Sequence, residues 1–265
     1  MKKLLLKLFT VMILASFSGG IQAQTSVSHE LGGFFGIASL QTDFGISGNF
    51  ASANQATMAF GVSYYMKFFG SQYNWRSGSS YFSEHFKMKA EFSYLNNSKI
   101  EHENLDQVGP NFRETMERMT GSVTMYNGGL SLEYYFIELE DYTSFFRSSG
   151  QVNPFVGLGL QYTHATPDIF VDGVSLKGQP EPYEDLIPKW QEGAIDLEEQ
   201  GIMSATASAG VRFGLEMVDF VVEGRYQYFF SDKLEGLYAP DDPGNKNNDT
   251  MVFINLGIVY VFGKN

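Results

Sequence analysis

Apolar and polar side chains alternate with a period of two in seven segments of the chain, as they do in β-strands with two unlike faces. In residues 220–231, Phe220, Val222 and Tyr226 share one face, whereas Glu223 and Arg225 share the other. The other six segments are residues 57–67, 85–94, 124–136, 155–163, 205–216 and 252–262. A Gly-rich segment at residues 31–40 predicts one more strand, although its two faces are hard to tell apart. The pattern therefore predicts an all-β fold with eight antiparallel strands.

The polar faces of these strands combine small residues with charges of both signs. The charged positions are Lys87, Lys89, Glu91, Glu133, Arg212, Glu216, Glu223 and Arg225. A soluble barrel or sandwich would turn such a face to water and bury the apolar face. In a membrane, each basic residue turned toward lipid near the midplane would cost about 2–4 kcal/mol. We expect a membrane barrel to enclose all eight charges in its lumen.

The size of an eight-stranded barrel predicts what these charges do. Its interior is just wide enough to be filled by side chains. An unpaired charge enclosed there is costly, so the bases and acids are expected to pair across the lumen. The prediction is a packed polar interior rather than a large open pore.

The first 23 residues have the features of a secretory signal peptide. Lys2, Lys3 and Lys7 precede a short apolar run at residues 8–17, and residues 21–23 offer a small-residue cleavage site. The apolar run is shorter than the roughly 20 residues that span a bilayer. We therefore expect an exported protein with a signal peptide at residues 1–23 and a single barrel domain at residues 24–265.

The predicted connections alternate between long and short. Residues 41–56, 96–121, 166–201 and 232–249 are long, whereas those near 69–82, 137–151 and 217–219 are shorter. Outer-membrane barrels have long external loops and short periplasmic turns. The four long connections together carry a net charge of −13, and the whole mature chain carries −15. We expect long acidic external loops where any extracellular ligand would bind, with short helices at residues 111–119 and 183–200.

The amino-acid composition excludes several kinds of site and partner. The chain has no cysteine, which excludes disulfides and thiolate metal sites. Its net charge of −12 argues against a nucleic-acid partner. The four histidines form no short metal-binding spacing, and the acidic loops have no calcium-loop pattern, so we predict no metal and no cofactor. Aromatic residues reach 15%, and tyrosines on the apolar faces predict aromatic belts at the membrane boundary: Tyr64, Tyr94, Tyr126, Tyr134, Tyr162, Tyr228 and Tyr260.

The C-terminal strand carries the most specific motif. Asn255, Gly257, Tyr260 and Phe262 follow the order polar-x-Gly-x-x-aromatic-x-aromatic. Here the chain resembles small bacterial outer-membrane β-barrels of the outer-membrane-protein A and W type, although three residues follow Phe262. The resemblance implies an up-and-down transmembrane barrel in the outer membrane, in contact with its lipids. It also implies that these four residues are read as an assembly signal by the barrel-assembly machinery.

The predicted function is non-enzymatic: a structural or surface-interaction role. One alternative is a narrow porin-like channel for small solutes. Another is a lipid A-modifying hydrolase, because some eight-stranded barrels deacylate lipid A with a His-x-Ser pair on the outer wall, and His164-Ala165-Thr166 resembles that pair. Threonine replaces serine here, and no third group that would orient His164 is evident from the sequence.

Overall fold

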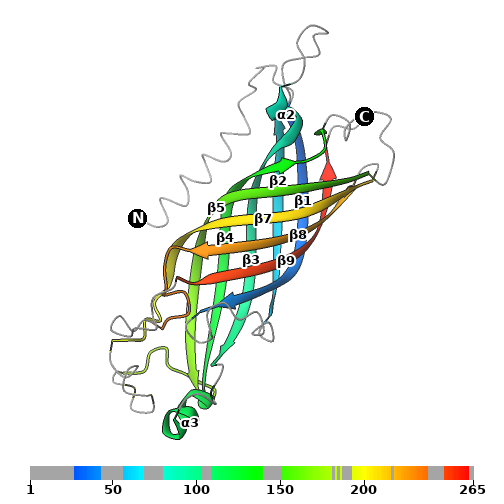
Figure 1. The fold of residues 1–265 in the computed structure, drawn as a ribbon. Coiled ribbons are helices and arrows are strands. Elements are labelled where there is room, and N and C mark those ends of the chain that lie inside the picture. The colour runs from blue at the N-terminus through cyan, green and yellow to red at the C-terminus, as the bar shows by residue number, and fades with distance from the viewer. Residues whose placement is uncertain are drawn as a thin grey trace, which may run out of the picture.

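The computed structural model describes residues 27–42, 56–68, 80–102, 105, 109–139, 151–180, 183, 186, 193–215, 218–237 and 248–262. The predicted signal peptide lies outside these residues. Eight strands form the wall of the barrel: β1 (Val27–Gln41), β2 (Thr57–Phe68), β3 (Phe86–Glu101), β4 (Met119–Tyr135), β5 (Gln151–Val171), β7 (Gln200–Gly214), β8 (Val218–Phe229) and β9 (Thr250–Val261). Each pairs with its chain neighbour in antiparallel fashion. β1 also pairs with β9, for example Leu31 with Tyr260, so the sheet closes on itself (Figure 1). The predicted eight-stranded antiparallel barrel is confirmed.

Among the described residues, three smaller elements lie outside the wall. β6 (Val174–Ser175) folds back onto the end of β5. The helices α2 (Tyr81–His85) and α3 (Pro110–Arg118) lie at opposite ends of the barrel (Figure 1). We call the end with α2, where β1 begins and β9 ends, the terminal end, and the end with α3 the loop end. Within the described part of the chain, no helix is long and apolar enough to span a membrane.

The two faces of the wall are those of a membrane barrel. Outward apolar side chains are largely uncovered, such as Met58 at 66% exposed and Leu158 at 71%. Inward charged side chains are buried, with Lys89 at 3% exposed and Arg212 at 0%. A soluble barrel would have the opposite arrangement, because it needs its apolar face covered. The outer surface is therefore an apolar band suited to lipid.

Three strands run further toward the loop end than the sequence predicted. β3 continues to Glu101, β4 begins at Met119, and β5 continues to Val171, so the predicted loops 96–121 and 166–201 are partly strand. In these extensions the alternation is inverted. Val123 and Ile169 point inward and are buried, whereas Thr124 and Asp168 on the other face are half-buried. A β-bulge between Leu95 and Ser98 in β3 also shifts the register. The predicted strands end too early because the alternation with apolar residues on the outward face ends at these positions.

The helix predicted at residues 111–119 is confirmed as α3, which has proline in its first turn and Arg118 in its last. No helix occurs among the described residues of 183–200, where Ile195 instead forms an isolated bridge with Leu237. The helix predicted there is absent from the described positions. α2 was not predicted, because residues 81–85 overlap the end of the predicted turn at 69–82 and the start of the predicted strand at 85–94.

Tyrosines line the outer wall at two levels. Tyr94 and Tyr126 are cross-strand partners toward the loop end, with ring centroids 4.9 Å apart. Tyr134 and Tyr260 lie toward the terminal end, where Tyr260 contacts Phe262 edge to face at 5.3 Å. All seven tyrosines of the predicted belts are half-buried or exposed, the state expected of side chains at a lipid–water boundary.

Candidate functional site in the barrel interior

The barrel interior changes in character along its axis, and β8 shows the change within one strand. Its inward residues begin with Asp219 at the terminal end, continue through Glu223 and Arg225 to Gln227, and finish with Phe229 at the loop end. β3 and β7 follow the same order of charged, neutral polar and apolar positions, for example from Arg212 through Ser204 to Ile202 in β7. We refer to the three parts as the charged layer, the neutral layer and the apolar plug.

The charged layer contains equal numbers of bases and acids contributed by six strands. Its members are Glu30, Lys67, Lys87, Lys89, Glu91, Glu133, Arg212, Asp219, Glu223 and Arg225. Each is at most 8% exposed. A balanced set of buried charges is tolerable only when each has partners, so the geometry of the pairs decides whether the layer is stable.

One group of ion pairs is centred on Glu30 of β1. Its carboxylate accepts from Lys87 Nζ at 2.7 Å through one oxygen and from Arg212 Nη2 at 2.6 Å through the other. Arg212 also donates through Nε to Asp219 Oδ2 at 2.7 Å. The chain Lys87–Glu30–Arg212–Asp219 thus joins β3, β1, β7 and β8 across the lumen.

A second group lies next to it, toward the loop end. Lys89 Nζ is 2.5 Å from Glu223 Oε2, 3.0 Å from Glu133 Oε1 and 3.4 Å from Glu91 Oε2. Arg225 donates through Nη2 to Glu91 and to Glu223, both at 2.6 Å, and also binds Glu91 through Nη1. One ammonium and one guanidinium therefore hold three carboxylates together.

Aromatic rings and further polar groups complete the contacts of the charged layer. Arg212 lies over the ring of Tyr65 and Lys87 over that of Tyr135, both at 5.2 Å from the centroid. The Tyr135 hydroxyl donates to Glu133 Oε2 at 2.7 Å. A cavity lined by members of the layer measures about 20 Å³, which is room for about one water molecule. Packed rings and ion pairs fill this section of the lumen.

The neutral layer is a small hydrogen-bonded network. Thr163 Oγ1 donates to Asn127 Oδ1 at 2.6 Å, and Asn127 Nδ2 donates to Ser93 Oγ at 3.2 Å. Gln227 Nε2 donates to Ser204 Oγ at 2.8 Å and to Thr163 Oγ1 at 3.3 Å. Five strands meet in this network, and all five side chains are at most 1% exposed.

The apolar plug combines inward strand residues with residues of the long connections. The strands contribute Leu95, Val123, Met125, Ile202, Phe229, Met251 and Phe253, among others. The connections contribute Leu186, Ala194, Ile195, Leu234 and Leu237, and Met116 of α3 packs against the same cluster. The bridge between Ile195 and Leu237 and a 2.9 Å hydrogen bond from the Asp196 amide to the Gly236 carbonyl join two connections over the mouth. Gly236 has a positive φ of 84°, which favours glycine at this turn.

The charges singled out from the sequence can now be located. Lys87, Lys89, Glu91, Glu133, Arg212, Glu223 and Arg225 meet in the charged layer. Glu216 lies outside the described residues. Glu30 and Asp219 were not predicted to belong to this set, because Glu30 precedes a predicted strand and Asp219 falls within a predicted turn. Lys67, in the predicted strand at residues 57–67, was not predicted as one of the paired charges either.

The residues of the C-terminal motif divide between the two faces of β9. Asn255 is buried in the lumen and donates to Glu223 Oε1 at 3.4 Å. Gly257 lies beside Phe34, and the ring of Phe34 also occupies the space that a side chain at Gly61 would need. Tyr260 and Phe262 are exposed on the outer face. Half of the motif thus serves the interior, and its aromatic half is turned toward lipid.

His164 has an acidic neighbour that is distant from it in the sequence. It lies on β5, and its Nε2 is 3.6 Å from Glu199 Oε2, just before β7. Both side chains are more than one-third exposed. Glu199 is therefore an acid near His164, at a separation longer than a hydrogen bond.

Comparisons with known proteins add little to this picture. No family model and no curated protein matches the chain. Among solved structures, Neisserial surface protein A is similar at 11% identity and a TM-score of 0.43, covering 89% of this chain and 98% of its own. Ail, the attachment invasion locus protein of Yersinia pestis, has 12% identity, a TM-score of 0.40 and coverages of 89% and 98%. The outer membrane enzyme PagL has 10% identity, a TM-score of 0.36 and coverages of 87% and 98%.

These similarities are too distant to assign a role to the chain. The closed wall, the apolar outer band and the enclosed charges are observed directly, and a closed barrel is the only β-structure that satisfies every backbone group inside a bilayer. On these grounds the chain is a small closed β-barrel whose outer wall is suited to a lipid bilayer.

Proposed function

We propose that the protein is a non-enzymatic outer-membrane barrel with a structural or surface-interaction role. The observation that carries the proposal is the filled interior: ion pairs, a neutral hydrogen-bonded layer and an apolar plug follow one another along the axis. In the orientation expected from the loop lengths, the terminal end faces the periplasm and the loop end faces outward. What the protein offers to its surroundings is then its rigid wall and its external connections.

The filled interior argues against a porin-like channel. A solute would have to separate buried pairs such as Lys89–Glu223, and breaking such a pair costs about 3–5 kcal/mol because a charge is left uncompensated. It would also have to displace connections whose apolar side chains are buried over the lumen.

Planar-bilayer recording of the refolded protein tests this proposal. We expect no stable conductance steps above the lipid baseline, with a general porin in the same bilayer as the positive control. Reproducible ion-sized steps from heat-modifiable, folded protein would favour the channel and overturn the closed-barrel proposal.

The proposed partners follow from the two faces of the wall. Outer-membrane lipids would contact the apolar band, and the barrel-assembly machinery would read the exposed Tyr260 and Phe262 of β9. Any extracellular ligand would meet the acidic connections at the loop end.

The role of the two aromatic residues in assembly can be tested by substitution. Tyr260→Ala with Phe262→Ala should lower the yield of folded, heat-modifiable barrel in cells but not in refolding from urea with detergent. The outward pair Ile254→Ala with Leu256→Ala is the matched control.

A lipid A hydrolase is the second candidate, and the contact between His164 and Glu199 is the specific observation in its favour. An acid beside a histidine can orient it as a general base, although threonine at position 166 is a hindered nucleophile. Our proposal predicts that overproduction leaves the mass spectrum of lipid A unchanged. If overproduction of the wild type removed an acyl chain from lipid A and overproduction of the His164→Asn variant did not, the protein would be a hydrolase and the structural proposal would be wrong.

A further inference from the structure

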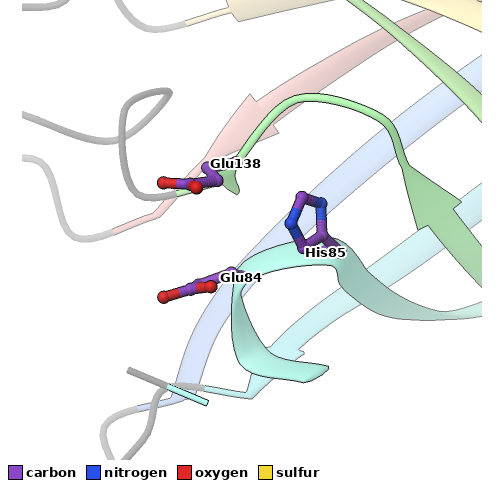
Figure 2. A group of neighbouring side chains, drawn as sticks. All are labelled: Glu84, His85 and Glu138. Carbon is purple, nitrogen blue, oxygen red and sulfur yellow. The ribbon is translucent and has the colours of Figure 1, made fainter. Parts of the chain in front are cut away.

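A second cluster of polar side chains lies at the terminal end, away from the lumen network. It consists of Glu84 and His85 of α2 and of Glu138, which follows β4 (Figure 2). Each residue offers one ligand atom, and these atoms all lie within 4.8 Å of one another. The cluster therefore joins the connection before β3 to the connection after β4.

The histidine of this cluster is held in one tautomer. His85 is 8% exposed, and its Nδ1 is 2.8 Å from the backbone carbonyl oxygen of Tyr135. Because a carbonyl can only accept, Nδ1 carries the proton and Nε2 keeps a free lone pair. Among the described residues, none forms a hydrogen bond with Nε2. A histidine that donates one nitrogen to a carbonyl and leaves the other bare has the arrangement typical of a metal ligand.

Aromatic contacts fix the plane of the ring. The centroid of His85 is 4.4 Å from that of Tyr81 and 5.5 Å from that of Tyr134. The hydroxyls of these two tyrosines are hydrogen-bonded at 2.8 Å, which closes a clasp around the imidazole. The ring cannot turn away from the carboxylates without breaking this clasp.

The backbone beneath each carboxylate is also fixed. The buried Asn153 side chain donates to the Ile137 carbonyl at 3.0 Å and accepts from the Ile137 amide at 3.2 Å, directly before Glu138. Leu139, directly after it, is buried in the mouth of the barrel. On the other side, the Glu84 amide donates to the Ser80 carbonyl at 3.0 Å. The scaffold is rigid, whereas the exposed Glu138 carboxylate can still change rotamer.

We propose that Glu84, His85 and Glu138 bind one divalent transition-metal ion of the Zn²⁺ class. Imidazole with carboxylates suits Zn²⁺, whereas Ca²⁺ and Mg²⁺ prefer ligand sets made of oxygen alone. At Zn–ligand distances of about 2.0–2.2 Å the three atoms would lie about 3.4 Å apart, so the carboxylates need to move inward by about 1 Å. Water would complete a four-coordinate site. The ion would tie α2 to the segment after β4 at the mouth of the barrel.

Zinc titration of the refolded full chain, in competition with a chromogenic chelator, tests this proposal. We expect one Zn²⁺ per barrel and no displacement by a hundredfold excess of Ca²⁺. His85→Gln keeps an amide donor for the Tyr135 carbonyl but removes the imidazole, and Glu138→Gln changes only an exposed side chain. Each should weaken Zn²⁺ binding by more than about 100-fold, because even partners outside the ligand shell cost 10–100-fold.

The matched controls are His164→Gln and Glu199→Gln, which remove a histidine–glutamate pair at the loop end and should leave Zn²⁺ affinity unchanged. X-ray absorption at the zinc edge should show one imidazole nitrogen, with oxygen as the remaining ligands. Heat modifiability confirms that each variant is folded, and Glu138→Gln keeps the test valid if His85→Gln misfolds. Wild-type affinity in the folded Glu138→Gln variant, equal competition by Ca²⁺, or no bound Zn²⁺ would overturn the proposal.

Discussion

The charged layer and the apolar plug bury their side chains equally well but by opposite means. Arg212 and Phe229 are both 0% exposed. Arg212 lies between Glu30 and Asp219, whereas Phe229 packs among apolar side chains of strands and connections. A buried charge depends on its specific partners, and a buried apolar side chain depends on the fit of its surroundings. The two ends of the lumen should therefore respond differently to substitution.

The largest effect is expected at Arg212. Arg212→Met would leave Glu30 and Asp219 without their shared guanidinium and should lower the free energy of unfolding by about 3–5 kcal/mol. Urea titration scored by heat-modifiable gel mobility measures this. Adding Glu30→Gln and Asp219→Asn should restore part of the loss, since no uncompensated charge then remains. An unchanged urea midpoint for Arg212→Met would show that the ion pairs contribute nothing.

A smaller and more local effect is expected in the apolar plug. Leu237→Ala shortens a side chain of a residue that is 2% exposed. It should lower the stability of the folded connections by about 2–3 kcal/mol. Because Leu237 lies in a connection, the loss should appear as faster proteolysis of the connections while the barrel keeps its urea midpoint. Leu158→Ala, on the lipid-facing surface, is the control and should change neither. Global unfolding of Leu237→Ala would mean that the plug and the wall form one cooperative unit.

The neutral layer should respond less strongly than either neighbour. Thr163→Val removes the donor to Asn127 and an acceptor for Gln227, at a cost of about 1–2 kcal/mol. The urea midpoint should fall measurably, whereas that of Thr120→Val, on the outward face of β4, should not. A midpoint equal to wild type would show that the remaining polar groups find other partners.

The smallest effect concerns an exposed ion pair at the loop end. Arg118 donates through Nε to both carboxylate oxygens of Asp172, which ties α3 to the turn after β5 and lowers the pKa of Asp172. A lowered pKa means that this contact stabilises the turn fully above the ordinary pKa of aspartate and is lost as the pH falls through the lowered value. An NMR titration of the Asp172 carboxyl carbon should show the lowered pKa in wild type and an ordinary value in Arg118→Gln. Arg113→Gln, which removes the exposed pair with Glu117, is the control and should leave the titration of Asp172 unchanged.

The sequence predicted the wall of the barrel well because the period-two alternation is a local property. In the membrane section, lipid lies outside and the charges lie inside, so every strand has apolar residues on its outward face and polar residues on its inward face, as residues 57–67 and 220–231 show. Beyond that section the environment outside becomes water, and the alternation inverts at Thr124 and Asp168. If the apolar residues are assumed to face outward along the whole strand, the predicted strand ends where the alternation inverts, which is too early. The inversion itself could have been read from residues 163–171.

The sequence predicted the interior less completely. Lys89 and Glu223 could be assigned to the lumen from their strands alone, but Glu30 and Asp219 stood at uncertain strand ends. The partners of Arg212 are 182 and 7 residues away along the chain, so its pairing depends on the registers of β1, β7 and β8 together. The site at Glu84, His85 and Glu138 was missed for the same reason, because no short spacing links the three residues.

By itself, the sequence determined the number of strands in the wall, the charged face of the strands with clear alternation, and the helix predicted at residues 111–119, because each depends on neighbours within a few positions. The tertiary structure decided which charges meet, how the connections close the loop end, and where His85 finds its carboxylates. These outcomes depend on barrel closure, which sets the relative height of strands that lie far apart in the chain.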